Sequence, residues 1–401
     1  MRTPAEPSER ELRMAFSADR LDALMDQAGL DVLLATSKHN VQYLLGGHRA
    51  MFFDYMDAMG TSRYLPIFVY VKGAPEKAAY VGHRMEGYQR EVWPFRVATA
   101  HTSAAGSVDA MEMAVDHIRR LGLRPRRIGV EMAFVPLDAG MALRSAFPGV
   151  EIVDAVTVLE RLRARKSAAE LELLRTASDG VIDAMLAVIA THGPGTTKRE
   201  LTEAMRREET NRGLTFEYCL IAAGQSYNRA ASDQRWEEGD VLSLDSGGNY
   251  RGYIGDLARM AILGEPDGEL GELLAEIETI QQAAFRPIKA GVMGGEIYAA
   301  AEPLVRRSRQ GNHLHFLAHG MGLVSHESPH LTQRGPVPYS DEDAYRPLEA
   351  GMVISVETTL THPRRGFIKL EDTVVVTGDG HEVYGNRARG WNRGGTALAQ
   401  H

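Results

Sequence analysis

The sequence predicts two domains, of which the first has an α/β fold. The chain has 401 residues, more than one ordinary hydrophobic core accommodates. In its first half, short apolar segments typical of strands alternate with segments of helical periodicity, a pattern that indicates an α/β domain. A basic run followed by a helix-start signal marks a junction near residue 165. We therefore expect one domain over residues 1–165 and a second over residues 166–401.

The first domain begins with a helix expected over residues 17–27, where Leu21, Leu24 and Met25 have helical spacing and Gly29 is placed to end the helix. A second helix is expected over 107–121. Short apolar runs predict strands at 31–36, 67–71, 78–81, 128–131 and 150–153. The turn residues 73–75 join the second and third of these strands into a hairpin.

Residues 46–66 form an unusual segment between the first strand and the hairpin, rich in aromatic residues and methionine, with Arg49 and Arg63. One interpretation is a loop packed on its own domain. The other is a lid that contributes aromatic and arginine contacts to a substrate pocket. In the second interpretation Arg63 is a candidate substrate-binding residue.

The junction carries a basic run, which we interpret as solvated linker surface: Arg161, Arg163, Arg165 and Lys166. Ser167 and Glu170 form a capping box that starts a helix with one apolar stripe as far as Ile189. Residues 193–195, Gly-Pro-Gly, end that helix. Thr197 and Glu200 form a second capping box and start the next helix.

Composition excludes several classes of function. The net charge of −8 disfavours a protein that binds the phosphate backbone of nucleic acids. No run approaches 18 apolar residues, so no membrane span is expected, and the polar N-terminal residues have no apolar core of signal-peptide length, so no signal peptide is expected either. The expected compartment is the cytoplasm. Because Cys219 is the single cysteine, a metal site within the chain must use histidine and carboxylates.

The second domain contains a predicted hairpin with two aspartates. Residues 241–245 form its first strand, 246–250 its turn and 253–263 its returning strand, which brings Asp245 and Asp256 near one another. Two carboxylates held that close repel each other unless they are protonated or bridged by a cation.

Three further residues favour a metal site. His319 precedes Gly320, and a glycine there lets the backbone pass close to a bound group. Glu357 ends the apolar strand 353–356, and Glu371 interrupts the apolar strand 367–376, positions that are costly for unpaired charges. One shared site explains all these placements. Four carboxylates and one imidazole suit two divalent ions.

The order of these five residues resembles the dinuclear metal set of the pita-bread metallopeptidases, family M24, which include methionine aminopeptidase, aminopeptidase P and prolidase. The resemblance is carried by residues 244–256, 319–329, 355–357 and 370–373. Residues 40–46 and 166–170 are similar to the creatinase, prolidase and aminopeptidase P branch. The resemblance implies an α/β creatinase-like N-terminal domain followed by an α+β pita-bread catalytic domain.

The resemblance also implies roles for residues. The metal ligands would be Asp245, Asp256, His319, Glu357 and Glu371, holding two divalent ions (Mn, Co, Zn or Fe). A hydroxide bridging the ions would attack the scissile carbonyl. His326 would donate a hydrogen bond to the substrate or to the developing oxyanion, and Glu357 would accept the proton of the attacking water. A homodimer is implied as well.

Two positions depart from the family pattern. Proline-specific members carry a pocket histidine in the segment matching residues 225–232, which contains none here. Asn228 and Arg229 are the candidates to replace it, and Arg229 suits an anionic substrate. Lys369 stands where arginine is common; it keeps the charge but loses the bidentate geometry.

The expected function is therefore hydrolysis of a dipeptide or small amide, as in Xaa-Pro dipeptidase and aminopeptidase P. A first alternative is a non-peptidase enzyme on the same scaffold: an unusual amide hydrolase, a creatinase-like amidinohydrolase or a lyase of dimethylsulfoniopropionate. A second alternative is a binding protein without enzymatic activity.

Overall fold

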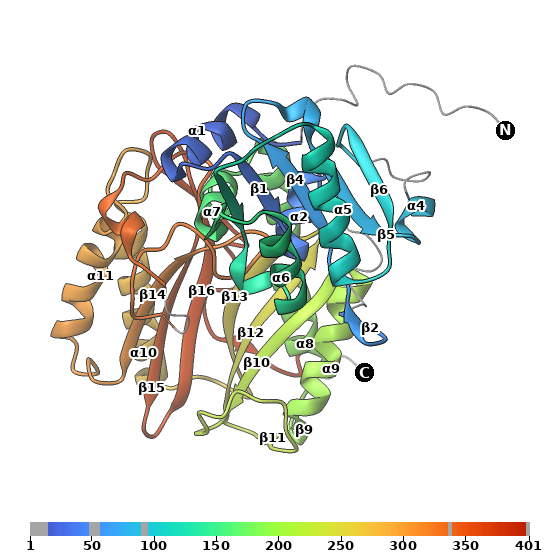
Figure 1. Cartoon of the computed structure of the whole chain (residues 1–401). Helices are drawn as coiled ribbons and strands as arrows, with labels where there is room; N and C mark the ends of the chain where they lie inside the picture. Colours follow the sequence, from blue (N-terminus) through green and yellow to red (C-terminus); the bar gives the residue numbers. More distant parts are fainter. Residues whose placement is uncertain (1–14, 48–56, 90–94, 336–338, 398–401) are drawn as a thin grey trace. The chain divides into compact units, whose positions relative to one another are not determined.

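The computed structural model describes residues 15–47, 57–89, 95–335 and 339–397. The chain separates into two compact units, Met1–Arg163 and Ala164–His401, and each is described by itself. Figure 1 labels most of their helices and strands.

The first unit is built on a mixed sheet whose described strands follow the order β6-β5-β4-β1-β7-β8 (Figure 1). Its strands are β1 Val32–Ala35, β2 Ala58–Met59, β3 Ser62–Arg63, β4 Ile67–Val71, β5 Ala79–His83, β6 Thr99–Ala104, β7 Arg127–Val130 and β8 Glu151–Asp154. Its helices are α1 Ala18–Ala28, α2 Lys38–Leu44, α4 Glu86–Gln89, α5 Ser107–Arg120, α6 Leu137–Ala146 and α7 Val156–Arg163, with short 3-10 turns at Pro75–Lys77 and Met132–Phe134.

Strand β1 shows how this sheet is covered on both faces. Val32 and Leu34 belong to the apolar cluster that contains residues of α5 and α6. Leu33 and Ala35 belong to the other cluster, which contains residues of α1 and α7. Successive side chains of a strand point to opposite faces, so the fully apolar sequence of β1 is that of a strand buried on both sides.

Most of the elements expected in this unit are confirmed. Ser17 caps α1 by accepting a hydrogen bond from the backbone N–H of Arg20, and Gly29 ends the helix in the left-handed conformation with a φ of 66°. The hairpin of β4 and β5 is antiparallel, as expected. Of the segment 46–66, residues 48–56 lie outside the described residues. Its end forms the short pair β2 and β3, which carries Arg63.

The interpretation of the basic run at the junction as solvated surface is wrong for two of its residues, which are buried. Arg163 Nη1 donates a hydrogen bond to Asn40 Oδ1 within the first unit. Lys166 Nζ lies 3.0 Å from Glu327 Oε1 within the second unit, and both of these side chains are 1% exposed. Lys166 is thus paired with a carboxylate of opposite charge, and Arg163 has the side-chain oxygen of Asn40 as a hydrogen-bond acceptor.

The second unit is built on a larger, mainly antiparallel sheet, whose described strands follow the order β10-β12-β13-β16-β15-β14, with β17 paired to β16 and β18 to β13. Its strands are β9 Thr196–Thr197, β10 Thr215–Ala223, β11 Arg235–Trp236, β12 Val241–Tyr250, β13 Tyr253–Ile262, β14 Leu314–Gly320, β15 Val353–His362, β16 Gly366–Val376, β17 His381–Tyr384 and β18 Asn392–Arg393. Its helices are α8 Ala168–Thr191, α9 Lys198–Asn211, α10 Gly268–Phe285 and α11 Glu296–Arg307, with a 3-10 turn at Glu342–Tyr345.

Helices cover one face of this sheet. Helix α8 crosses β13 so closely at Gly255 that an added Cβ would lie 2.6 Å from the backbone nitrogen of Ser178. Gln281 of α10 donates a hydrogen bond of 2.6 Å to Asp372 of β16. Gly255 and Asp372 therefore mark the helix-covered face, and the residues next to them in each strand point to the opposite face.

Both predicted capping boxes are present, at Ser167 with Glu170 and at Thr197 with Glu200. Two predicted strand ends are wrong. Residues 246–250 continue β12 instead of turning, and the chain reverses at Arg251 and Gly252, which have φ values of 53° and 98°. The glycines that suggested a turn make room for neighbours instead: a Cβ on Gly247 would lie 2.3 Å from the Tyr218 ring.

Strand β15 also runs beyond its predicted end at Glu357, as far as His362. The added residues include three threonines, whose branched side chains favour extended backbone.

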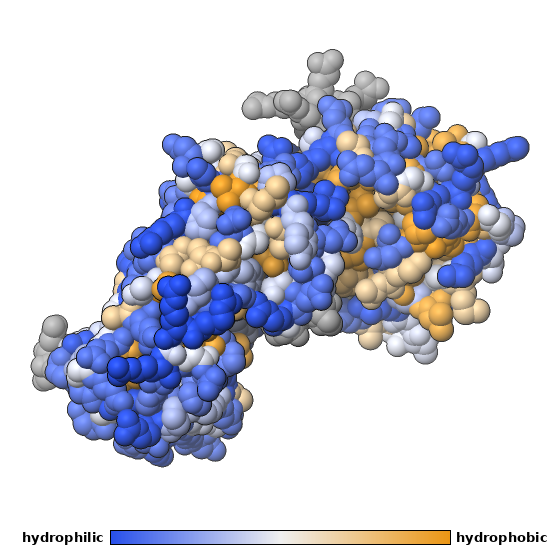
Figure 2. All heavy atoms as spheres, turned by 90° about the vertical axis from the view of Figure 1, so that its left-hand side faces the viewer, coloured by the Kyte–Doolittle hydropathy of each residue, from blue (hydrophilic) through white to orange (hydrophobic). Residues whose placement is uncertain are grey.

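On the face shown in Figure 2, hydrophilic residues predominate and hydrophobic ones form separate patches. Among the described residues, no helix is both long and apolar enough to cross a membrane.

Candidate metal centre

The hairpin of β12 and β13 places two of the predicted ligands on one face. Asp245 lies opposite Ala258, and Asp256 lies opposite Gly247. Opposite residues of an antiparallel pair share a face, as do residues two apart in one strand, so both carboxylates point the same way. This is the juxtaposition that the sequence predicted, although the turn that produces it lies elsewhere.

The neighbouring strands add the other three predicted ligands to that face. Glu371 of β16 lies opposite Ala258 on one side and opposite Glu357 of β15 on the other. His319 of β14 lies opposite Ser355, which is two residues before Glu357. The register of five strands therefore collects all five side chains on the face that is not covered by helices.

Three of these residues are close enough to share an ion. One ligand atom each of Asp256, His319 and Glu371 lie within 4.8 Å of one another, and all three residues are buried. His319 Nε2 lies 3.8 Å from Glu371 Oε1 and 3.9 Å from Glu357 Oε1.

The tautomer of His319 also fits metal binding. Its Nδ1 lies 3.2 Å from the carbonyl oxygen of Gly320, to which it donates, so the lone pair is on Nε2. Nε2 is buried and has no hydrogen-bond partner among the described residues. A buried acceptor aimed at carboxylates is costly, whereas a histidine held through its other nitrogen is the usual form of a metal ligand. These residues therefore fit a divalent ion.

Burial sets the electrostatics of the centre. It raises the pKa of Asp256, Asp245 and Glu357 above the ordinary values of these carboxyl groups. Burial acts on Glu371 in the same direction, but the ammonium charge of Lys369 and, when its ring is protonated, His319 outweigh burial and lower the pKa of Glu371. Buried carboxylates this close need cations to remain ionised together.

Lys369 supplies one such cation from within the chain. Its Nζ lies 2.6 Å from Asp245 Oδ2, 2.5 Å from Glu357 Oε2 and 2.8 Å from Glu371 Oε2. Burial alone would lower the pKa of Lys369, but the three carboxylates raise it well above its ordinary value. The sequence marked Lys369 only as a replacement for arginine and did not predict this position among the ligands.

Arg229 supplies a second cation. Its Nη2 forms an ion pair with Asp245 Oδ2, and its guanidinium lies 5.0 Å from the centre of the Phe367 ring. Asn228, the other candidate replacement for the pocket histidine, has its Oδ1 bonded to the backbone N–H of Ala230. The structure therefore brings Arg229 to the centre, against a ligand carboxylate. A contact of Arg229 with substrate remains a prediction.

His326 lies beside the centre, with its ring stacked on that of His319 at 3.8 Å between centroids. Its Nδ1 lies 3.4 Å from the Tyr339 hydroxyl. Burial lowers the pKa of His326 to about 4, so the imidazole is neutral near pH 7. Gly320 makes this loop possible, because a Cβ there would lie 2.4 Å from the carbonyl oxygen of Glu327.

Two supporting residues were missed by the sequence. Tyr218 donates its hydroxyl to Asp256 Oδ1, and Ser355 donates to Glu371 Oε1 at 2.7 Å. The available signals were Gly247, an interior strand glycine over which the Tyr218 ring passes, and the position of Ser355 two residues before Glu357. Both hydroxyls hold ligand carboxylates in place.

The opposite face anchors the last ligand strand. Arg259 Nη2 lies 2.7 Å from Asp372 Oδ1, and both of these side chains are fully buried. Arg259 Nη1 also donates to the carbonyl oxygen of Glu371 at 2.8 Å. The acidic pair at 371 and 372 thus divides between the two faces of β16, one carboxylate toward the centre and one toward the helices.

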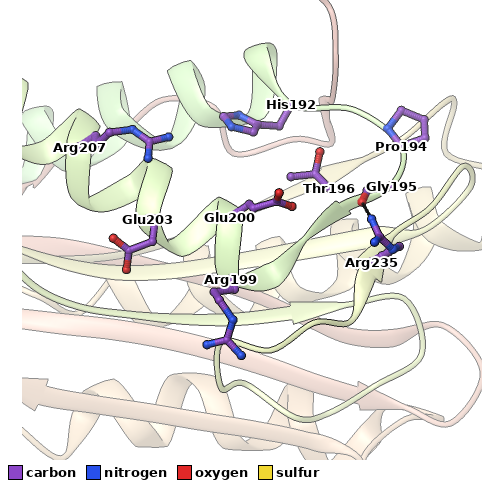
Figure 3. Close-up of a pocket in the computed structure, with 9 residues that line it drawn as sticks. All are labelled: His192, Pro194, Gly195, Thr196, Arg199, Glu200, Glu203, Arg207 and Arg235. Atoms are coloured by element: carbon purple, nitrogen blue, oxygen red, sulfur yellow. Dashed lines mark hydrogen bonds between the residues drawn. The ribbon is translucent and has the colours of Figure 1, made fainter.

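Two hollows among the described residues are lined by none of the predicted metal ligands. Arg63 lines a cavity of about 180 Å³ in the first unit together with Lys38, Asp57 and Tyr64, so its contact with substrate remains a prediction. Figure 3 shows an open hollow of about 700 Å³ between the end of α8 and α9. It is lined by His192, Pro194, Gly195, Thr196, Arg199, Glu200, Glu203, Arg207 and Arg235.

Comparison with known proteins identifies the family models and the relatives that this chain matches. Residues 172–378 match the model of metallopeptidase family M24, and residues 18–165 match the creatinase/prolidase N-terminal domain. The chain is 28% identical over 391 residues to the probable dipeptidase PepE of Mycobacterium tuberculosis, an alignment that covers 94% of each protein. It is also 28% identical over 229 residues to the Xaa-Pro dipeptidase of Pyrococcus furiosus, covering 56% of this chain and 63% of that protein.

A solved structure shows the same fold. The Xaa-Pro dipeptidase from Bacillus anthracis superposes with a TM-score of 0.75 at 24% identity, covering 92% of this chain and 97% of that one. The predicted combination of a creatinase-like domain and a pita-bread domain is confirmed. Because the M24 model matches more than half of the chain and the creatinase/prolidase model matches its first domain, this protein belongs to metallopeptidase family M24, in its creatinase and prolidase branch.

Proposed function

We propose that this metallopeptidase is a dipeptidase that hydrolyses Xaa-Pro dipeptides or similarly small amides. The observation that carries the proposal is the single sheet face on which β12, β13, β14, β15 and β16 gather four carboxylates and the unpartnered Nε2 of His319. The names of two relatives, a probable dipeptidase and an Xaa-Pro dipeptidase, support the substrate class.

The proposed ligand set is that of the sequence prediction: Asp245, Asp256, His319, Glu357 and Glu371. A bound divalent metal would polarise the scissile carbonyl and lower the pKa of a water molecule. The sequence predicts two ions of Mn, Co, Zn or Fe. The proposed activity needs divalent metal bound by residues of this set; the number of ions and the role of Asp245 are considered separately below.

We assign the proton transfer to Glu357. Its side chain is 14% exposed, whereas those of His319, Glu371 and Asp245 are 1%, 2% and 3% exposed and Asp256 is 4% exposed, so Glu357 is the most exposed of the proposed ligands. A carboxylate at that position can accept the proton of the attacking water and pass it to the leaving amine.

We assign hydrogen bonding to the substrate to His326. Its neutral imidazole stacks directly on the ring of His319, which is one of the proposed ligands. An N–H donor there would stabilise the negative charge that develops on the carbonyl oxygen.

Arg229 and Arg63 are kept as proposed substrate contacts. We also propose a homodimer, as the family resemblance implies, and a cytoplasmic location, as expected from the sequence. Light scattering on a sizing column would measure the mass of the assembly.

The proposal is tested by assaying protein loaded with Mn²⁺ or Co²⁺ on Xaa-Pro dipeptides, dipeptides without proline and non-peptide amides. Xaa-Pro dipeptides should be hydrolysed. Asp256→Asn and Glu371→Gln should each abolish turnover and metal retention, since each removes a carboxylate from the buried cluster. Asp233→Asn, a change at an exposed ion pair, is the control and should behave like the wild type. Metal-loaded protein that cleaves no Xaa-Pro bond would instead favour a non-peptidase enzyme.

A further inference from the structure

Asp245, the first predicted ligand, is contacted by two cationic side chains. Its Oδ2 lies 2.6 Å from Lys369 Nζ and also forms an ion pair with Arg229 Nη2. Asp245 is 2% exposed, so these contacts are largely shielded from water. Lys369 stands at one departure from the family pattern, and Arg229 lies within residues 225–232, the segment that carries the other. Two separate departures therefore meet at one carboxylate.

The carboxylates divide the centre into two neighbouring positions. Glu371 has Oε1 at 3.8 Å from His319 Nε2 and Oε2 at 2.8 Å from Lys369 Nζ. Glu357 is arranged in the same way, with Oε1 at 3.9 Å from His319 and Oε2 at 2.5 Å from Lys369. One position thus adjoins the unpartnered imidazole nitrogen, and the other is filled by the lysine ammonium group.

The charges agree with this division. The four carboxylates carry four negative charges, which would balance two divalent ions. Lys369 and Arg229 offset two of these charges, which leaves the charge that one divalent ion balances. A second ion beside Asp245 would have to displace the ammonium group or be buried within a few ångströms of it, and both are costly at low dielectric.

We propose that this centre binds one divalent ion, at the position formed by Asp256, His319, Glu357 and Glu371, and that the ammonium group of Lys369, supported by Arg229, takes the place of the second ion. This inference rests on the proposed metal-dependent function of the same centre. In the complex, Asp245 serves as the counter-ion of two side chains rather than as a metal ligand, and Lys369 holds Glu357 and Glu371 in place.

The experiment measures metal content directly. The wild-type protein is equilibrated with excess Mn²⁺, dialysed against micromolar Mn²⁺ and analysed by mass spectrometry for manganese and by electron paramagnetic resonance. We expect about one ion per chain and the six-line spectrum of isolated Mn²⁺. The double variant Lys369→Met/Arg229→Met removes both cations and should bind about two ions per chain, with the broadened spectrum of a coupled pair.

A matched control is Arg365→Met. Arg365 lies on the same hairpin as Lys369, but it pairs with Asp267 and Glu269, away from the centre, so this variant should retain about one ion. Two ions per wild-type chain, or a folded double variant that still binds one, would overturn the inference. If the double variant does not fold, the wild-type stoichiometry and spectrum decide. The dipeptide assay is read separately: two ions with Xaa-Pro cleavage refute only the single-ion inference, whereas one ion without cleavage refutes only the substrate proposal.

Discussion

At the scale of single residues, Glu209 is a buried carboxyl group behind the ligand hairpin. Its Oε1 accepts a hydrogen bond of 2.8 Å from Ser246, the residue after Asp245. Its Oε2 is buried without a hydrogen-bond partner among the described residues. Burial raises the pKa of Glu209 to about 8, so the folded protein holds this group protonated at neutral pH.

This pKa predicts how stability depends on pH. The folded pKa of Glu209 lies above its ordinary value of 4.5, so its contribution to stability is complete below that value and is lost as the pH rises through about 8. Glu209→Gln cannot ionise. Between pH 5.5 and 7.5 we expect the free energy of unfolding of the wild type to fall relative to that of the variant by about 1 kcal/mol per pH unit.

Urea denaturation of both proteins at several pH values measures this difference. Glu203→Gln, a change at an exposed position of the same helix, is the control and should follow the wild type at every pH. If wild type and Glu209→Gln lost stability in parallel, Glu209 would not be the protonated group assigned here.

At the scale of elements, the contact between α8 and β13 connects helix packing to the metal centre. Gly255 has no side chain where α8 passes, and an added Cβ would meet the backbone of Ala177 and Ser178 at 2.6 to 2.8 Å. Because the obstacle is backbone, no side-chain rotation can relieve the clash. Asp256, the next residue, carries any displacement of β13 directly to the centre.

We therefore expect Gly255→Ala to destabilise the protein by about 1–3 kcal/mol and to weaken metal retention. Gly271→Ala is the matched control: Gly271 is exposed in α10, and an added Cβ meets nothing within 4 Å. That change should stabilise α10 by about 1 kcal/mol and leave metal retention unchanged. Denaturation midpoints and metal analysis measure both effects. A Gly255→Ala protein with unchanged stability and metal content would contradict the close packing of α8.

At the scale of the whole molecule, the two units have separate cores, and only the second contains the proposed ligands. A metal that binds only the folded second unit stabilises that unit through mass action. Mn²⁺ at 100 times its dissociation constant should raise the free energy of unfolding of residues 164–401 by about 3 kcal/mol. In calorimetry the melting temperature of this unit should therefore rise, and that of the first unit should stay unchanged.

Addition of a chelator should reverse the shift, and Asp256→Asn should show none, because it lacks one carboxylate of the cluster. Equal shifts of both transitions would show that the units unfold together. No shift in either would argue against metal binding by the folded centre.

Local signals explain how much of the fold the sequence determined. The capping boxes at Ser167 and Thr197, the cap pair Ser17 and Gly29, and the strand 367–376 depend on residues within a few positions of one another, so sequence patterns report them directly. The ends of β12 and β15 were mispredicted because residues that seemed to end these strands are explained by contacts with neighbouring strands. Gly247 makes room for the ring of Tyr218 on β10, and Glu357 lies opposite Glu371 of β16.

The sequence by itself determined the identity and order of the proposed ligands, since charged residues inside apolar strands are visible without coordinates. Only the tertiary structure decided which charges accompany them. Lys369 and Arg229 are 140 residues apart in sequence and meet at Asp245 because β10, β12, β13 and β16 lie side by side. The reach of a long side chain depends on strands distant in sequence, so no local pattern shows where its charge ends up.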